Sequence, residues 1–315
     1  MKRGVFTALC CLILLFSVYT VQAVPSVSDV VSAVNQTTYR NYLDNMLYTH
    51  AGDNRGSGAE HDLACDNIYS EFNSFGLTAS YSPFLYSGVS GTNVIGVHEG
   101  KVRPQDFFII GAHYDSVNNP GADDNASGTA GVLEAARVLS TYDFEATLVF
   151  VAFDREENGL FGSKIYAQQH ATDNIMGMVS LDMIAYNNGS NAASIYGRDS
   201  SNPFKNSLAS AVSTYGNGIS AVINGVLDAS DHAPFEAQGF QAALLIEYDV
   251  WNNPYYHKAG DSVDTLNYID YSFATNLVGS TVGFFATNAV LIPEPASAAI
   301  MTLAGLFIVL KRRKQ

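Results

Sequence analysis

Three residue types that often build functional sites are scarce in this chain: cysteine, tryptophan and the basic residues. The 315 residues include three cysteines, one tryptophan, and 16 lysines and arginines against 30 aspartates and glutamates. Cys10 and Cys11 lie in an N-terminal stretch that we expect to be removed, which leaves Cys65 alone. A single cysteine excludes an internal disulfide and a zinc site built from several thiolates. Any metal must therefore be held by histidine, aspartate and glutamate.

The two ends of the chain differ in composition from its middle. Residues 1–23, MKRGVFTALCCLILLFSVYTVQA, have a basic start, a short apolar centre, and Val21 and Ala23 at cleavage-site positions. This pattern is typical of a secretory signal peptide. Residues 292–315 join a Pro-Glu-Pro turn to an apolar run, Ala296 to Leu310, and four basic residues. The run is shorter than the roughly 20 residues of a membrane span. A buried C-terminal helix is therefore the alternative, but the basic end fits the positive-inside rule.

This tail, IPEPASAAIMTLAGLFIVLKRRKQ, resembles the PEP-CTERM sorting signal of Gram-negative bacteria. The resemblance implies a processing enzyme that cuts near the Pro-Glu-Pro and a transient anchor in the inner membrane. The product would be exported to the periplasm, the outer surface or the extracellular matrix. We therefore expect a signal peptide at residues 1–23, a folded domain at 24–290 and a sorting and transmembrane tail at 291–315.

The folded domain is expected to be strongly acidic. Removal of both ends would leave 10 basic and 29 acidic residues, a formal charge of about −19. Nucleic acid is therefore excluded as an expected partner, because its phosphates are read by lysine and arginine. Contact with a membrane is expected only through the tail.

Segments with strand and helix patterns alternate along the middle of the chain. Uniformly apolar runs such as ATLVFVAFD predict buried strands, and segments with one apolar face, such as SGTAGVLEAARVLS, predict helices. The expected strands are residues 92–100, 101–116, 146–154, 177–186 and 240–249. The expected helices start within residues 27–49 and continue at 63–76, 127–140, 159–170 and 203–216. Without an internal repeat or linker, this order predicts one α/β domain, a three-layer α/β/α sandwich around a mixed, mainly parallel sheet.

Acidic and histidine side chains follow several of the expected strands. Glu156 and Glu157 come directly after a buried strand, where adjacent like charges repel each other and resist loss of water unless they are compensated. Ligands bind at the carboxyl ends of strands in open α/β sheets, so these side chains should meet at one rim. The candidates are His113, Asp115, Asp123, Asp124, Glu156, Glu157, Asp182 and His257. Imidazoles and carboxylates without cysteine indicate a pair of divalent cations, with zinc the leading candidate.

Six motifs occur in the order and spacing of a known enzyme family. They are AHYDS, GADDNASG, REENGLFGS, SLDM, SDHAPF and YYHKAGDSVDTL, and they fall between about residues 95 and 267. The chain thereby resembles the M28 family of zinc aminopeptidases, in the transferrin-receptor and glutaminyl-cyclase superfamily. The resemblance implies a zinc-peptidase-like fold, two Zn²⁺ per chain, and hydrolysis of the first peptide bond of a substrate with a free N-terminus.

The resemblance also implies a set of metal ligands. They are His113, Asp123, Glu157, Asp182 and His257. His113 and Asp182 would hold one zinc, Glu157 and His257 would hold the other, and Asp123 would bridge the two. The peptide bond from Asp123 to Asp124 is implied to be cis.

Other residues of the motifs are implied to act beside the metals. Asp115 would orient the imidazole of His113. Glu156 would stay free of metal and act as the general base, which takes a proton from the attacking water and passes it to the leaving amine. Asp231 and His232, in SDHAPF, would line the substrate side of the site or support it structurally.

Two positions depart from the family pattern. Some relatives have an oxyanion-stabilising tyrosine shortly before the SDH motif, where this chain has Leu227. Tyr256, on the substrate side, is a candidate to replace it, as are Tyr248 and Tyr255, or the zinc acts alone. Many relatives have a small residue before the Glu pair, whereas this chain has Arg155. Its guanidinium either pairs with a carboxylate and tunes the base, or lies on the surface.

Rival functions remain open at the level of sequence. A glutaminyl cyclase shares the fold but works with one zinc, and a non-catalytic adhesion or matrix-binding module has lost metal ligands. A carboxypeptidase or an amidohydrolase also stays possible, because motifs for metals say little about the leaving group.

Overall fold

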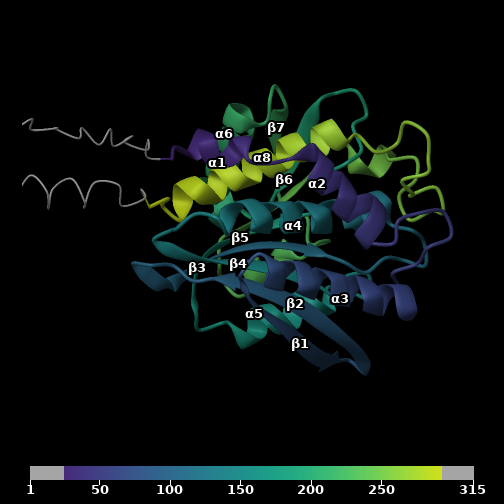
Figure 1. The fold of residues 1–315 in the computed structure, drawn as a ribbon, viewed down its shortest axis with the longest axis horizontal. Helices are drawn as coiled ribbons and strands as arrows, with labels where there is room; N and C mark the ends of the chain where they lie inside the picture. The colour runs from purple at the N-terminus through teal and green to yellow at the C-terminus, as the bar shows by residue number, and fades with distance from the viewer. Residues whose placement is uncertain (1–24, 293–315) are drawn as a thin grey trace, which may run out of the picture. The chain divides into compact units, whose positions relative to one another are not determined.

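A mixed sheet of eight strands forms the centre of the computed structural model, which describes residues 25–292 (Figure 1). The expected signal peptide and almost all of the expected sorting tail lie outside the described residues. The strand order is β1-β2-β4-β3-β5-β8-β6-β7. The strands are β1 Thr78–Tyr86, β2 Val89–His98, β3 Arg103–His113, β4 Ala146–Phe153, β5 Asn174–Leu181, β6 Ala192–Tyr196, β7 Ser220–Ile223 and β8 Ala242–Glu247.

The middle of the sheet is parallel. β3 pairs in parallel with β4 on one side and with β5 on the other, and β5 pairs in parallel with β8. Every residue of β4 is buried, as expected of a parallel strand covered on both faces. The carboxyl ends of these four strands therefore lie along one edge of the sheet, and the loops that follow them share that rim.

Antiparallel pairs flank the parallel middle of the sheet on both sides. β1 and β2 form a hairpin, β2 pairs with β4, and β6 pairs with β8, while β7 is parallel to β6. Residues 92–100 and 101–116 fall in β2 and β3 as expected, but the two strands are not neighbours, because β4 lies between them. The sequence did not predict β1, β6 or β7, since they are short or carry many polar residues.

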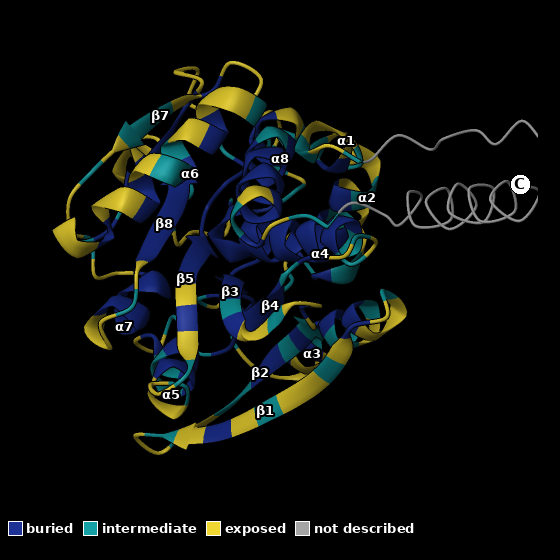
Figure 2. Ribbon diagram, turned by 90° about the vertical axis from the view of Figure 1, so that its left-hand side faces the viewer, coloured by how far each residue is buried: buried dark blue, intermediate teal, exposed yellow. Residues whose placement is uncertain are grey.

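Helices cover both faces of the sheet (Figure 2). α3, α4, α6 and α8 pack on one face with α1 and α2 beside them, and α5 and α7 pack on the other. The helices are α1 Val27–Ser32, α2 Gln36–Asn41, α3 Ala59–Ser74, α4 Gly128–Leu139, α5 Phe161–Gln169, α6 Asn202–Tyr215, α7 His232–Ala237 and α8 Tyr271–Asn288. None of the helices between residues 25 and 292 has the length and apolar character that a membrane span requires. The expected three-layer α/β/α sandwich is confirmed.

Close packing of α4 against the sheet positions the rim. Its apolar residues, Leu133 and Leu139 among them, are buried in the larger core. Its first residue is Gly128, where a Cβ would lie 2.2 Å from the carbonyl oxygen of Leu181, the last residue of β5. Only glycine permits that approach. The loop before α4 is therefore held next to the residue that follows β5.

Candidate active site

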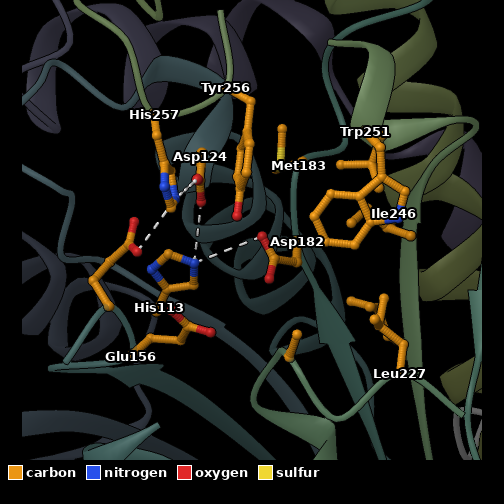
Figure 3. Close-up of a pocket in the computed structure, with 14 residues that line it drawn as sticks. His113, Asp124, Glu156, Asp182, Met183, Leu227, Ile246, Trp251, Tyr256 and His257 are labelled. Atoms are coloured by element: carbon orange, nitrogen blue, oxygen red, sulfur yellow. Dashed lines mark ion pairs between the residues drawn. The ribbon is translucent and has the colours of Figure 1, made fainter. Parts of the chain in front are cut away.

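Side chains from four loops meet at the carboxyl edge of the sheet (Figure 3). His113 is the last residue of β3, and Asp182 directly follows β5. Glu156 and Glu157 follow β4, and His257 lies in the loop after β8. All five line one pocket, because the strands that precede them are parallel neighbours in the sheet.

Asp124 lies between the two imidazoles. Its Oδ1 is 3.4 Å from Nε2 of His113, and its Oδ2 is 3.1 Å from Nε2 of His257. On the far sides, His113 Nε2 lies 3.6 Å from Oδ1 of Asp182, and His257 Nε2 lies 3.4 Å from Oε2 of Glu157. The arrangement is a chain of ligand-type atoms in which one carboxylate serves both histidines.

Two overlapping groups in this chain are compact enough to hold a cation. The ligand atoms of His113, Asp124 and Glu157 lie within 4.8 Å of one another, and so do those of His113, Glu156 and Asp182. Glu156 thus belongs geometrically to a possible ligand set, although the resemblance assigns it to proton transfer.

The position of the shared carboxylate corrects the sequence-based expectation by one residue. Asp123 lies behind the pocket, where its carboxylate accepts hydrogen bonds from the Ala185 N–H (2.8 Å) and from Asn253 Nδ2 (3.1 Å). The cis peptide bond is also displaced by one position, since it joins Asp124 to Asn125. Of the two adjacent aspartates, only Asp124 lines the pocket.

The loop that carries Asp124 is fixed by buried polar groups. The carboxylate of Asp261 accepts the backbone N–H groups of Asp123 (2.7 Å) and Asp124 (3.1 Å). Arg55 is fully buried, and its guanidinium donates to backbone carbonyls, including those of Tyr114 (2.9 Å) and Gly121 (2.6 Å). Asp261 belongs to the motif YYHKAGDSVDTL and was within reach of sequence reasoning, whereas nothing in the polar stretch around Arg55 marked it.

Protonated imidazoles compensate the carboxylates when no metal is bound. Hydrogen bonds to Asp124 and Glu157 raise the pKa of His257 to about 10. Burial opposes protonation of His113, but Glu156 and the neighbouring aspartates raise its pKa well above the usual range. Burial alone would raise the pKa of Asp124, yet its contacts with both imidazoles lower it to about 2. The site is therefore built to hold positive charge between its acidic groups.

The side chains that meet in the pocket are suitable ligands for zinc. Glu157 Oε1 is a buried oxygen that makes no hydrogen bond among the described residues, and Asp124 Oδ2 faces Nε2 of His257 at 3.1 Å. A buried carboxylate oxygen without a donor is costly unless a cation satisfies it. Imidazole nitrogens and carboxylate oxygens are ligands that zinc accepts, and metal binding would release the protons from His113 and His257.

Asp115 connects the two segments that carry these ligands. One of its carboxylate oxygens lies 3.5 Å from Nδ1 of His113, and its carbonyl oxygen lies 3.2 Å from the same nitrogen. The carboxylate also accepts the backbone N–H groups of Glu156 (3.1 Å) and Glu157 (3.3 Å). Asp115 thus positions an imidazole and the Glu pair at once.

Asp231 and His232 are buried and do not line the pocket. Burial raises the pKa of Asp231 to about 7, against the opposing charge of His113, and burial lowers the pKa of His232 to about 3. Asp231 in turn contributes to the raised pKa of Glu156. This placement favours support of the site over contact with substrate.

The other half of the pocket is apolar. Tyr256 stacks on His257 with ring centroids 3.9 Å apart, and burial raises the pKa of its hydroxyl. Leu227, Ile246 and Trp251 face the carboxylates across the pocket (Figure 3). The indole of Trp251 is 62% exposed, and the sequence reasoning did not single it out although it is the chain's one tryptophan.

The remaining tyrosine candidates and Arg155 do not enter the pocket. Tyr255 packs edge-on against Tyr268, with ring centroids 4.8 Å apart, and Tyr248 is exposed. Arg155 donates to the backbone carbonyls of Gly56 (2.6 Å) and Ser90 (3.1 Å). Its Nε also lies 3.6 Å from Oδ1 of Asp154, so Arg155 does pair with a carboxylate, but with one that does not line the pocket.

Comparison with known proteins identifies the family of the chain. Peptidase family M28 matches residues 93–280 of the chain. Aminopeptidase YwaD of Bacillus subtilis is 31% identical over 208 residues, which cover 62% of this chain and 45% of YwaD. The chain spans less than half the length of the first curated relatives it matches, with 23%, 25% and 45% of each covered.

Solved structures show the same fold. The aminopeptidase LapA of Legionella pneumophila superposes with a TM-score of 0.71 at 21% identity, covering 89% of this chain and 78% of LapA. A glutaminyl cyclase of Porphyromonas gingivalis superposes with a TM-score of 0.67 at 20% identity, covering 81% of this chain and 99% of the cyclase. The fold is thus shared with proteins named for two different reactions, while the family match spans more than half of the sequence and every rim residue. The chain belongs to peptidase family M28.

Proposed function

We propose that this chain is an exported zinc aminopeptidase with two zinc ions per chain. The observation that carries the proposal is the position of Asp124, with one carboxylate oxygen toward His113 and the other toward His257. A carboxylate between two imidazoles, each with a further acidic partner, is the arrangement that two cations with one shared ligand require.

The ligands divide into two sets with Asp124 in common. His113 and Asp182 would hold one zinc, and His257 and Glu157 the other, consistent with the imidazole–carboxylate distances of 3.6 and 3.4 Å. When bound, the zinc ions supply Lewis acidity, which polarises a carbonyl group and lowers the pKa of water. Asp115 would keep the imidazole of His113 oriented.

Glu156 is assigned to proton transfer. Its carboxylate lines the pocket beside His113, and burial raises its pKa well above the ordinary value. Once Glu156 is ionised, its raised pKa makes it a stronger base than an ordinary glutamate, so it can take a proton from an attacking water and pass it to the leaving amine. The hydroxyl of Tyr256, kept protonated by its raised pKa, is placed in the pocket to donate to the substrate carbonyl oxygen.

The substrate we propose is a peptide with a free N-terminus and an apolar first side chain. A protonated amine suits the acidic half of the pocket, where Glu157 and Asp182 lie. An apolar side chain suits the opposite half, formed by residues such as Leu227, Ile246 and Trp251.

Export and sorting complete the proposal. The signal-like residues 1–23 support secretion, and the tail at 291–315 supports an inner-membrane anchor that a processing enzyme removes. The mature enzyme would act in the periplasm, on the outer surface or in the extracellular matrix. Edman sequencing of the secreted protein and mass analysis of its C-terminus test this part.

One experiment tests the reaction itself. Purified chain is assayed on aminoacyl-nitroanilides, N-blocked peptides and peptides with N-terminal glutamine, before and after chelation and zinc restoration. We expect cleavage of the free aminoacyl substrates only, two zinc ions per chain, and full recovery with zinc. Conversion of glutaminyl peptides to pyroglutamyl products with one zinc per chain would identify a cyclase, and cleavage of blocked peptides would indicate a different amide hydrolase.

A further inference from the structure

The turn after β4 presents the two glutamates in an unusual backbone conformation. Arg155 and Leu160 have positive φ angles of 62° and 63°, a region that non-glycine residues seldom adopt without support from their surroundings. Glu156 and Glu157 lie between them, so the direction of both carboxylates depends on what holds this turn.

Asp154 is the anchor of the turn. Its side chain is fully buried and accepts hydrogen bonds from His61 Nε2 (2.8 Å) and from the Thr92 N–H (2.8 Å). Its own backbone N–H donates to Asn93 Oδ1 (3.0 Å). The residue two positions before Glu156 is therefore tied to α3 through His61 and to β2 through Thr92 and Asn93.

His61 also contacts the segment that carries His113, a proposed zinc ligand. Its ring lies 5.1 Å from the ring of Tyr114 at an interplanar angle of 30°, and Tyr114 stands between His113 and Asp115 in the sequence. The hydroxyl of Tyr114 donates to the Thr92 carbonyl oxygen (2.9 Å). One side chain of α3 thus touches the segments that follow both β3 and β4.

Carboxylates lie at both ring nitrogens of His61. The second ring nitrogen of His61, Nδ1, lies 3.0 Å from the exposed carboxylate of Asp62. Burial opposes protonation of His61, but the hydrogen bond to Asp154 leads the effects that raise its pKa. Arg155 also lies near this carboxylate, with its Nε 3.6 Å from Asp154 Oδ1, although it donates to the Ser90 carbonyl oxygen.

From these contacts we infer that His61 is a positioning residue for Glu156, acting through Asp154 and through Tyr114. The inference rests on the proposed function, because it assigns Glu156 its role in proton transfer. His61 does not line the pocket that contains His113, Glu156 and His257. It also lies outside the segment from residue 93 to 280 that matches the family. It fixes the turn so that Glu156 faces the substrate while Glu157 faces the metal.

A matched pair of variants tests the inference. In His61→Gln, the longer side-chain amide places a donor near the former Nε2 and keeps the bond to Asp154. In His61→Asn, the shorter amide reaches only the Nδ1 side, toward Asp62. Both variants keep a polar side chain of similar size. Asp62→Asn, which alters only the exposed partner, is the control.

The measurements are kcat, KM, zinc affinity by competition with a chelator, and the visible spectrum of the cobalt-substituted protein. We expect His61→Asn to lower kcat at least tenfold with KM changed less than threefold, because misplacement of a reacting group costs rate more than binding. Its zinc affinity should fall about tenfold and its cobalt spectrum should change, as Glu157 shifts with the turn. His61→Gln and Asp62→Asn should stay within threefold of the unmodified chain.

Equal kinetics and equal cobalt spectra in the Asn and Gln variants would overturn the inference, and so would a loss in Asp62→Asn as large as in His61→Asn. A failure of the proposed function appears differently, as an unmodified chain that binds zinc but cleaves no aminoacyl substrate. In that case zinc affinity and the cobalt spectrum still decide whether His61 positions the ligand turn.

Discussion

The assignment of the shared carboxylate to Asp124 predicts opposite outcomes for two adjacent substitutions. Asp124→Asn and Asp123→Asn both replace a buried carboxylate by an amide of the same shape. Only Asp124 lies between the imidazoles, at 3.4 Å from His113 and 3.1 Å from His257. Asp123 instead accepts the Ala185 N–H at 2.8 Å, a bond that an amide oxygen can also accept.

The pKa values set the magnitudes in the metal-free chain. The pKa of Asp124 falls from 3.8 to about 2 on folding, which corresponds to about 2 to 3 kcal/mol of stability. This contribution is present above pH 3.8 and is lost as the pH falls toward 2. Burial raises the pKa of Asp123 from 3.8 to about 6, so its buried charge costs about 3 kcal/mol at neutral pH.

Asp124→Asn should therefore destabilise the metal-free chain by about 2 to 3 kcal/mol and weaken zinc binding at least 100-fold, since both sites lose a charged ligand. Asp123→Asn should leave zinc content at the wild-type value. Its free energy of unfolding should change little, because the buried charge that is removed is costly, while the amide nitrogen takes the place of an oxygen that accepts a hydrogen bond from Asn253 Nδ2 or from the Ala185 N–H.

Metal analysis after dialysis against a weak chelator measures zinc binding. Urea unfolding of the metal-free proteins at pH 7 measures the free energy of unfolding. Loss of zinc from Asp123→Asn together with full zinc in Asp124→Asn would refute the reasoning. It would return the shared role to the first aspartate of the motif.

Three further predictions concern the general base Glu156, the apolar pocket residue Trp251 and the pH dependence of stability. Glu156→Gln should lower kcat by about 10² to 10⁴ with zinc content unchanged, whereas Glu157→Gln should lose zinc; steady-state kinetics and metal analysis on the same samples separate the two. Trp251→Ala should lower kcat/KM for leucyl substrates about fivefold, equivalent to about 1 kcal/mol of apolar burial. The value for alanyl substrates should stay nearly unchanged. Equal losses on both substrates would show that Trp251 does not bind the first side chain of the substrate. Because the pKa of His61 is raised on folding, its stabilising effect is complete below its unfolded pKa of about 6.5 and is lost as the pH rises through the folded value. Urea unfolding from about pH 6 upward should show this decline, and His61→Gln should flatten it.

The strand ends of the site were predictable because strong patterns mark them. The apolar run of β4 and the motif around His113 predict that buried parallel strands deliver histidine and carboxylate groups to one edge. The choice between Asp123 and Asp124 was not predictable, because it depends on how the loop before α4 bends. That bend is set by Asp261 and Arg55, which are remote in sequence.

The pairing of strands in the sheet also could not be predicted from local sequence patterns. β2 and β3 are consecutive along the chain and both are apolar, which suggests a hairpin, yet β4 lies between them. Pairing is decided by the packing of whole faces, which local alternation does not encode. The importance of His61 was likewise hidden, because a lone histidine in a polar helix start looks like any surface residue until Asp154 is seen beside it.

Arg55 holds the residues that lead to Asp124 without help from a cation. Its guanidinium donates to the backbone carbonyls of Tyr114 and Gly121, and these hydrogen bonds involve no metal ligand. A cation that bound here would displace protons from His113 and His257, whose pKa values are both raised. Metal affinity should therefore fall as the surroundings become more acidic.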